Sequence, residues 1–198
     1  PGCENMIYIG KLPDMDPKEL SPGAELASKT LGGKTFGNGD DPLHAQLVEV
    51  NLNDKNRDGV ITNNDGYYGY KSETISHDAN GSERTYQVDS TFLVKNTWVT
   101  FLNPDGTTEK LKLDVRVMQD TSGNIFIMPP PVNASIKEIE AMTSRPIVSV
   151  DFPKGKKNYD LCYDSIFTDR TCFPCFVRGT LIETDMGLIP VENLQQDM

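Results

Sequence analysis

The segment from residue 54 to residue 65 carries oxygen-bearing side chains at alternate positions, a pattern suited to metal binding. Asp54, Asn56 and Asp58 stand at its positions 1, 3 and 5, and Asp65 stands at position 12. A hard cation such as Ca²⁺ takes about six to eight oxygen ligands, and short side chains on a tightly curved backbone supply them from one segment. The spacing therefore predicts a calcium site with these side chains as ligands.

The middle of the segment fits the same interpretation. Gly59 stands at position 6, where the backbone must turn sharply, and Val60 at position 7 can offer its backbone carbonyl as a ligand. Ile61 at position 8 is an apolar residue that can enter a core. This order is typical of an EF-hand calcium loop. Asp65 replaces the usual closing Glu and is shorter, so the end of the loop must move inward, as in dockerin-like loops. The alternative is a polar turn between two strands.

The charges around the loop predict its affinity for calcium and the compartment in which the protein works. The loop has only three carboxylates, and Lys55 and Arg57 flank two of them, so we expect weak calcium binding that suits an extracellular setting. Residues 1–8 have neither a basic start nor an apolar run, so we expect secretion without an N-terminal signal peptide. The export signal would then lie elsewhere in a full-length protein.

Composition narrows the class of protein. The net charge of −10 disfavours nucleic acid and anionic membranes as partners, because both require a basic face. No segment has the apolar length that spans a bilayer. Apolar residues make up 37% of the chain, which also has 16 Gly and 13 Pro, so we expect many turns and short strands.

Alternating apolar residues predict a series of strands. We expect them at residues 44–52, 67–70, 84–94, 96–102, 111–117, 125–128 and 148–152. Turns at residues 104–106 and 121–124 would connect three hairpin-like units into an antiparallel meander with one dry and one wet face. Residues 1–20 are expected to be irregular. The sequence thus predicts a mainly β fold, an antiparallel β-sandwich or meander into which the EF-hand-like loop inserts between strands rather than helices.

Two short helices are expected beside the strands. Ser21 can cap a helix with Pro22 at its first position, and this helix should end at Gly32. Ser135 and Glu138 form a capping box that opens a second helix through residue 143. Its inward-facing residues are expected to be Ile136, Ile139 and Met142.

The cysteines and histidines offer little further chemistry. The cysteines are Cys3, Cys162, Cys172 and Cys175. Cys172 and Cys175 have CxxC spacing, but neither a second pair nor a histidine follows, so a zinc site is not expected. Cys162 could pair with Cys172 in an oxidising compartment, although the spacing does not choose among the three pairings. His44 and His77 are expected to be surface or strand residues rather than ligands or bases.

The last residues of the chain carry a dense motif. Its elements are Cys175, Phe176, Gly179, Thr180, Leu181, Ile182, Thr184, Gly187, Pro190, Val191, Glu192, Leu194 and Asp197. The segment resembles the opening of a bacterial hedgehog/intein (Hint) domain. Residues 37–43, 54–65 and 117–128 also look like the β-rich leader that precedes Hint domains in secreted alphaproteobacterial proteins, although this resemblance is looser.

The resemblance implies self-cleavage by an N-to-S acyl shift. The thiolate of Cys175 would attack the carbonyl of Pro174, and water or another nucleophile would resolve the thioester. The base and the oxyanion donors of this family come largely from a later Thr-x-x-His block, which does not occur between Cys175 and Met198. Pro174 and Gln196 also depart from the family pattern. Cleavage is therefore expected of a full-length protein rather than of this chain.

Two functions follow from these observations. In the first, residues 1–172 are a secreted, calcium-stabilised structural or surface module, and residues 173–198 are the truncated start of a Hint domain. In the second, the protein is a self-cleaving one whose role is release or transfer of that module. A conventional enzyme is not expected, because the leader has no Ser/His/Asp set, phosphate loop or carboxylate pair outside the cation loop. Self-association through exposed strand edges stays open.

Overall fold

The computed structural model describes residues 4–17, 24–62, 73–161, 165–174, 181–184 and 187–190. Antiparallel strands are the main regular element of this part of the chain, and two short α-helices accompany them. The prediction of a mainly β fold with antiparallel sheets and short helices is confirmed.

The largest sheet contains β1 (Asn5–Lys11), β2 (Thr35–Phe36), β3 (Leu47–Glu49), β8 (Val88–Leu102), β9 (Thr108–Asp120), β10 (Asn124–Met128), β11 (Ile147–Asp151) and β12 (Tyr159–Leu161). The smaller sheets contain β4 (Asn51–Asn53), β6 (Thr74–His77) and β7 (Arg84–Tyr86); β5 (Val60–Thr62) and β13 (Ser165–Phe167); and β14 (Leu181–Thr184) and β15 (Gly187–Pro190). The helical elements are α1 (Ala24–Leu31), α2 (Ile136–Thr143) and two 3₁₀ turns, η1 (Leu43–Ala45) and η2 (Lys156–Asn158).

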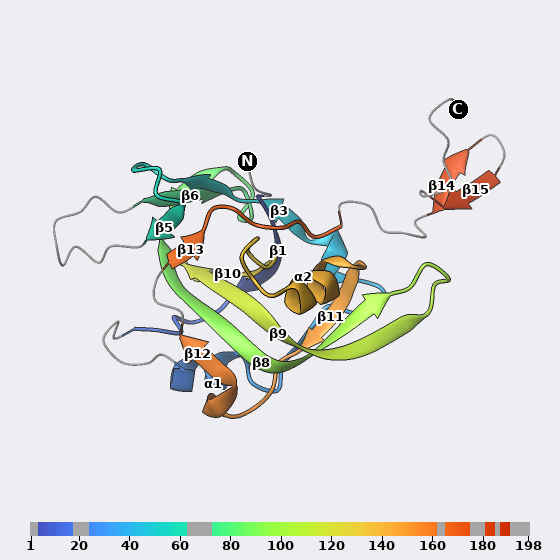
Figure 1. Cartoon of the computed structure of the whole chain (residues 1–198), viewed down its shortest axis with the longest axis horizontal. Coiled ribbons are helices and arrows are strands. Elements are labelled where there is room, and N and C mark those ends of the chain that lie inside the picture. The colour runs from blue at the N-terminus through green and yellow to red at the C-terminus, as the bar shows by residue number, and fades with distance from the viewer. Residues whose placement is uncertain are drawn as a thin grey trace.

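A meander of β8, β9 and β10 forms the centre of the largest sheet (Figure 1). The strand order is β2-β11-β8-β9-β10-β1-β3, and β12 pairs with another part of β8. The turn from β8 to β9 is closed by the Asn103 N–H, which donates to the Thr107 carbonyl at 2.8 Å. The turn from β9 to β10 is closed by the Gly123 N–H, which donates to the Asp120 carbonyl at 3.0 Å. Both turns lie where the sequence predicts them, so the meander is confirmed.

The N-terminal residues depart from the prediction. Residues 1–20 were expected to be irregular, yet β1 lies inside the sheet between β10 and β3. Met6 and Ile7 are both buried, and they enter different cores. A strand buried on both faces shows no alternation of apolar and polar residues, which is why the pattern missed it.

β8 is one strand where the sequence predicts a break. The expected strands at residues 84–94 and 96–102 are instead a short β7 and a continuous β8. A register shift against β9 occurs between Val94 and Thr97, and Asn96 lies there with φ of 57°. Asn tolerates this left-handed conformation better than most residues, so the chain forms a bulge and the strand continues.

The sheet separates two hydrophobic cores. On β10, Ile125 and Ile127 enter the first core, whereas Phe126 and Met128 enter the second. The expectation of one dry face and one wet face is therefore wrong for this strand, whose five residues are all buried. It holds better for the start of β9, where Lys110, Lys112 and Asp114 are exposed. The second core is the one that supports the candidate metal loop.

The predicted strand at residues 44–52 is split between two sheets. Its first part is η1 and β3, which pairs with β1, and its last part is β4, which pairs with β6. Val50 lies between them, fully buried, and its N–H donates to the Glu4 carbonyl at 2.8 Å. The chain therefore crosses from the large sheet to a small one directly before the loop that starts at Asp54.

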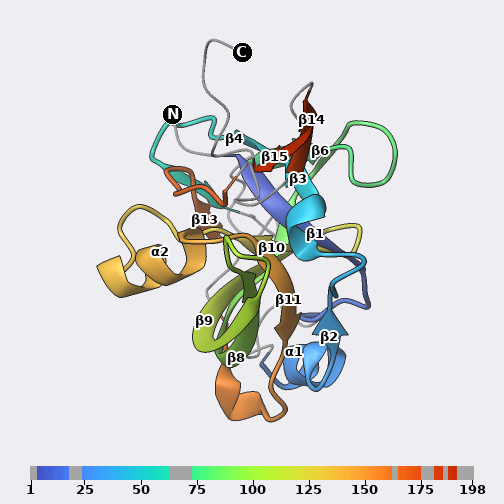
Figure 2. The ribbon, with the colours of Figure 1, turned by 90° about the vertical axis from the view of Figure 1, so that its right-hand side faces the viewer.

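The helices lie on opposite sides of the β8–β9 hairpin (Figures 1 and 2). α1 ends before Gly32, as predicted. α2 is capped as predicted, because the Ser135 hydroxyl accepts from the Glu138 N–H at 3.2 Å. Met142 is buried, but Ile136 is 75% exposed, so its predicted inward position is wrong. Neither helix in the described part of the chain has the length and apolar character that crossing a bilayer requires.

The two apolar residues of α2 should respond differently to truncation. Met142→Ala is expected to lower the free energy of unfolding by about 2–3 kcal/mol, because it leaves a cavity in the first core. Ile136→Ala should change it by less than about 0.5 kcal/mol. Urea unfolding of both variants measures the difference, and equal losses would show that the first turn of α2 is packed.

Strands β11 to β15 follow α2 along the chain. The predicted strand at residues 148–152 corresponds to β11, although β12 and β13 follow it. β14 and β15 pair with each other in an antiparallel hairpin. The predicted strand at residues 67–70 and the predicted helix start at Ser21 and Pro22 lie outside the described residues.

Candidate metal centre

The predicted calcium loop connects β4 to β5, so strands and not helices flank it. β4 pairs with β6 on one side, and β5 pairs with β13 on another. Ile61 in β5 is fully buried in the second core, as predicted for the apolar residue of the loop. The second core thus fixes the backbone that follows Gly59 and Val60 of the loop.

Backbone N–H groups inside the loop point at its carboxylates. Asp54 Oδ2 accepts from the Gly59 N–H at 2.8 Å, and Asp54 Oδ1 accepts from the Asp58 N–H at 3.3 Å. Asn56 Oδ1 also accepts from the Asp58 N–H, at 3.1 Å. Asp58 Oδ1 accepts from the Val60 N–H at 3.0 Å. These bonds curl the backbone around the side chains at positions 1, 3 and 5, as the predicted loop requires.

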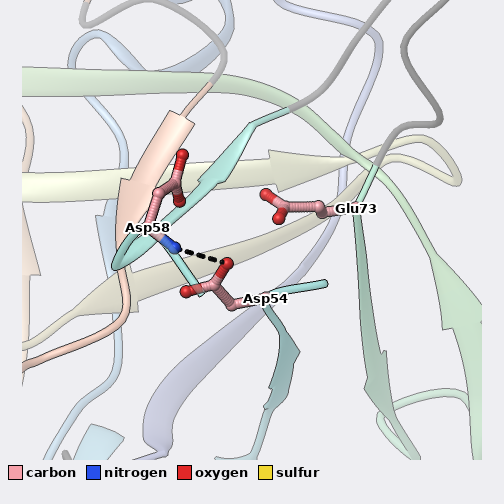
Figure 3. A group of neighbouring side chains, drawn as sticks. All are labelled: Asp54, Asp58 and Glu73. Carbon is pink, nitrogen blue, oxygen red and sulfur yellow. Dashed lines mark hydrogen bonds between the residues drawn. The ribbon is translucent and has the colours of Figure 1, made fainter. Parts of the chain in front are cut away.

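Glu73, which the loop pattern does not include, completes the cluster. It lies directly before β6, and β4 pairs with β6 so that Asn53 faces Thr74. The next residue on each strand is therefore Asp54 on one side and Glu73 on the other. Glu73 is only 6% exposed, and its carboxylate turns toward the loop (Figure 3). Its Oε2 accepts from the Thr62 N–H at 3.1 Å, and its Oε1 accepts from the Asn56 N–H at 3.4 Å.

One carboxylate oxygen each from Asp54, Asp58 and Glu73 lies within 4.8 Å of the others. Carboxylates this close repel one another when ionised, and a divalent cation between them would remove that repulsion. Oxygen-only donors of this kind fit a hard cation such as Ca²⁺ or Mg²⁺ rather than zinc or copper. The three carboxylates could therefore hold a hard cation, and they include Glu73, which the loop pattern does not predict.

The environment of Asp54 favours its ionised form. Desolvation acts to raise the pKa of this carboxyl, but hydrogen bonds oppose it. The Gly59 N–H, the Glu73 carboxyl and the N–H groups of Asp58 and Arg57 together hold the pKa of Asp54 below the usual value of an aspartate.

Gly59 is required by its backbone conformation and not by lack of space. Its φ is +84°, and a Cβ added to it would meet no atom within 4 Å. Gly59→Ala is therefore expected to lower the free energy of unfolding by about 1–2 kcal/mol. Gly39→Ala is the control, because Gly39 is equally open and does not have positive φ, and it should be neutral or slightly stabilising. Chemical denaturation in chelator measures both, and equal effects would contradict this account of the loop.

Some of the predicted site residues lie together in the loop, and the rest lie outside the described residues. Asp54, Asn56, Asp58 and Val60 lie together in the loop, and Val60 is the first residue of β5. Asp65, the predicted closing ligand, and Cys175, the predicted nucleophile, lie outside the described residues. Cys172 forms a disulfide, and the other three cysteines also lie outside the described residues.

A second cluster of polar side chains lies around His77 and Asp120 and is buried. His77 and Asp120 have fully buried side chains, and His77 Nε2 lies 2.7 Å from Asp120 Oδ2. His77 Nδ1 accepts from the Ala79 N–H at 3.2 Å, which leaves Nε2 to donate to the carboxylate. The imidazole also stacks on Tyr86 with 4.3 Å between ring centres. Both nitrogens are engaged inside the protein, and His77 is the last residue of β6, so the prediction of a strand residue is confirmed.

Glu73 could have been found from the sequence only by knowing that β4 pairs with β6. The two strands are separated by the loop and by residues 63–72, so no local spacing connects Glu73 to Asp54. Comparisons with models of known protein families, with curated proteins and with solved structures gave no match.

Proposed function

We propose that this chain is a calcium-stabilised structural module. The observation that carries the proposal is the cluster of Asp54, Asp58 and Glu73, which joins three carboxylates from two neighbouring segments at one point. Ca²⁺ would bind these carboxylates, with Asn56 and the Val60 carbonyl as further ligands and Asp65 as the loop-closing one. The ion would hold β4, β5 and β6 together over the second core. The end of the loop would move inward so that Asp65 reaches the ion, as in dockerin-like loops.

An extracellular location is part of the proposal. Lys55 and Arg57 reduce the negative potential of the loop, so its affinity should match the high calcium concentration outside cells rather than a resting cytosol. The disulfide at Cys172 supports an oxidising compartment. A module of this kind would serve as a structural or surface unit of a larger secreted protein.

Thermal melting with and without chelator tests the calcium proposal. Ca²⁺ that binds only the native state stabilises it by RT ln(1 + [Ca²⁺]/Kd), or about 2.7 kcal/mol at 100 times Kd. We expect the midpoint to rise with calcium concentration and to fall again with excess chelator. An unchanged midpoint up to millimolar calcium would reduce the loop to a polar turn.

The second candidate function is self-cleavage before Cys175 in a full-length Hint-type protein, with residues 173–198 as the start of the Hint domain. One observation favours it: Phe173 is 3% exposed and packs in the first core, so the chain is held by the module up to the residue before Pro174. A processing step after Pro174 would release an intact module. Intact mass of the full-length product is the test. A species ending at Pro174 supports processing, and uncut chain alone, even with added thiol, excludes it.

A further inference from the structure

The segment of residues 165–173, here called the strap, connects the candidate metal loop to the main body of the protein. Its first part, β13, pairs with β5 so that Ser165 faces Thr62 and Phe167 faces Val60. Thr168 extends this pairing, because its N–H donates to the Gly59 carbonyl at 3.0 Å. β13 and β5 lie side by side at the edge of the molecule (Figure 1). The strap is therefore hydrogen-bonded to β5 and to Gly59, the loop residue directly before it.

The second part of the strap is fixed to the chain that follows β10. The Thr171 N–H and hydroxyl donate to the Pro130 carbonyl at 2.9 and 2.6 Å. The Val132 N–H donates to the Asp169 carbonyl at 3.1 Å. The buried Arg170 guanidinium donates to the Pro129 carbonyl. This part is held without any contribution from the metal loop.

The residues that bind the first part of the strap also bind the carboxylate cluster. Gly59 donates its N–H to Asp54 Oδ2 and accepts from Thr168 through its carbonyl. Thr62 donates its N–H to Glu73 Oε2 and faces Ser165 of the strap. Gly59, directly before β5, and Thr62, the last residue of β5, thus each connect a cluster carboxylate on one side with the strap on the other. A change in the position of the carboxylates changes the edge to which the strap is bonded.

We propose that cation binding at Asp54, Asp58 and Glu73 regulates the attachment of the strap, so that β13 is locked on β5 when the ion is bound and opens more readily without it. This inference rests on the proposed calcium site. The ion thus controls the pairing of β13, whereas residues 169–173, which lead to Pro174, stay bonded to the chain that follows β10. By linkage, loss of strap pairing must weaken cation binding by the same factor.

Hydrogen exchange of the whole chain, measured by mass spectrometry in calcium and in chelator, tests the coupling. Calorimetric titration of the same sample with CaCl₂ gives Kd. At 100 times Kd, exchange of the amides of residues 165–168 is expected to slow by up to about 100-fold. Residues 147–151 in β11, which pair far from the loop, should change much less. Calcium binding with unchanged exchange in the strap would overturn the inference alone, whereas no binding would overturn the proposed function as well.

A pair of strap variants tests the reverse direction. Thr168→Pro removes the N–H that donates to Gly59, and calcium affinity should fall by about tenfold. Thr171→Val removes only the hydroxyl bond to Pro130, and affinity should stay within about twofold of the wild type. Equal affinities of the two variants would contradict the coupling. If Thr168→Pro does not fold, the hydrogen-exchange experiment on the wild-type chain decides whether the strap and the cation site are coupled.

Discussion

Glu73→Gln is expected to weaken calcium binding by at least about tenfold, equivalent to about 1.4 kcal/mol. The substitution removes one negative charge from a nearly buried ligand position and leaves the shape of the side chain unchanged. It removes repulsion from Asp54 and Asp58, but one of the two oxygens that accept backbone N–H groups becomes an amide NH2. In chelator the variant should therefore stay within about 1 kcal/mol of the wild type. The stability difference between the two proteins should grow when calcium is added. Titration calorimetry and melting in both conditions measure it.

Glu83→Gln is the matched control for this experiment. Glu83 is exposed and contacts Asn51 of β4 at 3.5 Å, so it lies on the same small sheet but outside the cluster. Its substitution should leave calcium affinity within about twofold. A Glu73→Gln variant that loses the same stability in chelator and in calcium would show that Glu73 only accepts backbone hydrogen bonds.

Asp120→Ala is expected to give the largest loss of stability, about 3–5 kcal/mol. The Asp120 carboxylate accepts from the N–H groups of Ser122 and Asn124 at 2.9 and 3.0 Å, from the Asn124 side chain at 2.9 Å and from His77. Alanine leaves all these buried donors without their acceptor. Because the same bonds fix the β9–β10 turn and hold β6 against the meander, the effect should reach both cores. Urea unfolding with comparison of m-values measures it.

Asp114→Ala provides the comparison on the same strand. Asp114 is exposed in the middle of β9, and its loss should change stability by less than about 0.5 kcal/mol. If the two aspartate variants differ by less than about 1 kcal/mol, the buried cluster around His77 does not support the fold as described.

Local features of the fold could be predicted because local interactions determine them. The hairpin turn at Gly106, the cap at Ser135 and the end of α1 before Gly32 each depend on a few adjacent residues. The same holds for the burial of Ile61, because the loop pattern places an apolar residue two positions after Gly59. In each case the residues that determine the feature are close together in the sequence.

The features that were missed depend on partners distant in sequence. β1 is buried on both faces by strands from elsewhere, so its pattern did not alternate. Glu138 was expected to serve the helix cap, but its carboxylate binds Arg116 of β9 at 2.8 Å, and Ile136 beside it faces solvent. Glu73 joins the metal cluster through the register of β4 and β6. None of these contacts can be read from spacing, because each requires knowing which strands are neighbours.

A crystal structure of the chain grown in calcium tests the central claim most directly. The account predicts one ion bound by carboxylate oxygens of Asp54, Asp58 and Glu73 at about 2.3–2.6 Å, with Asn56, the Val60 carbonyl and Asp65 completing its shell. Well-ordered density in which these side chains bind only water and backbone N–H groups, at calcium far above millimolar, would contradict it.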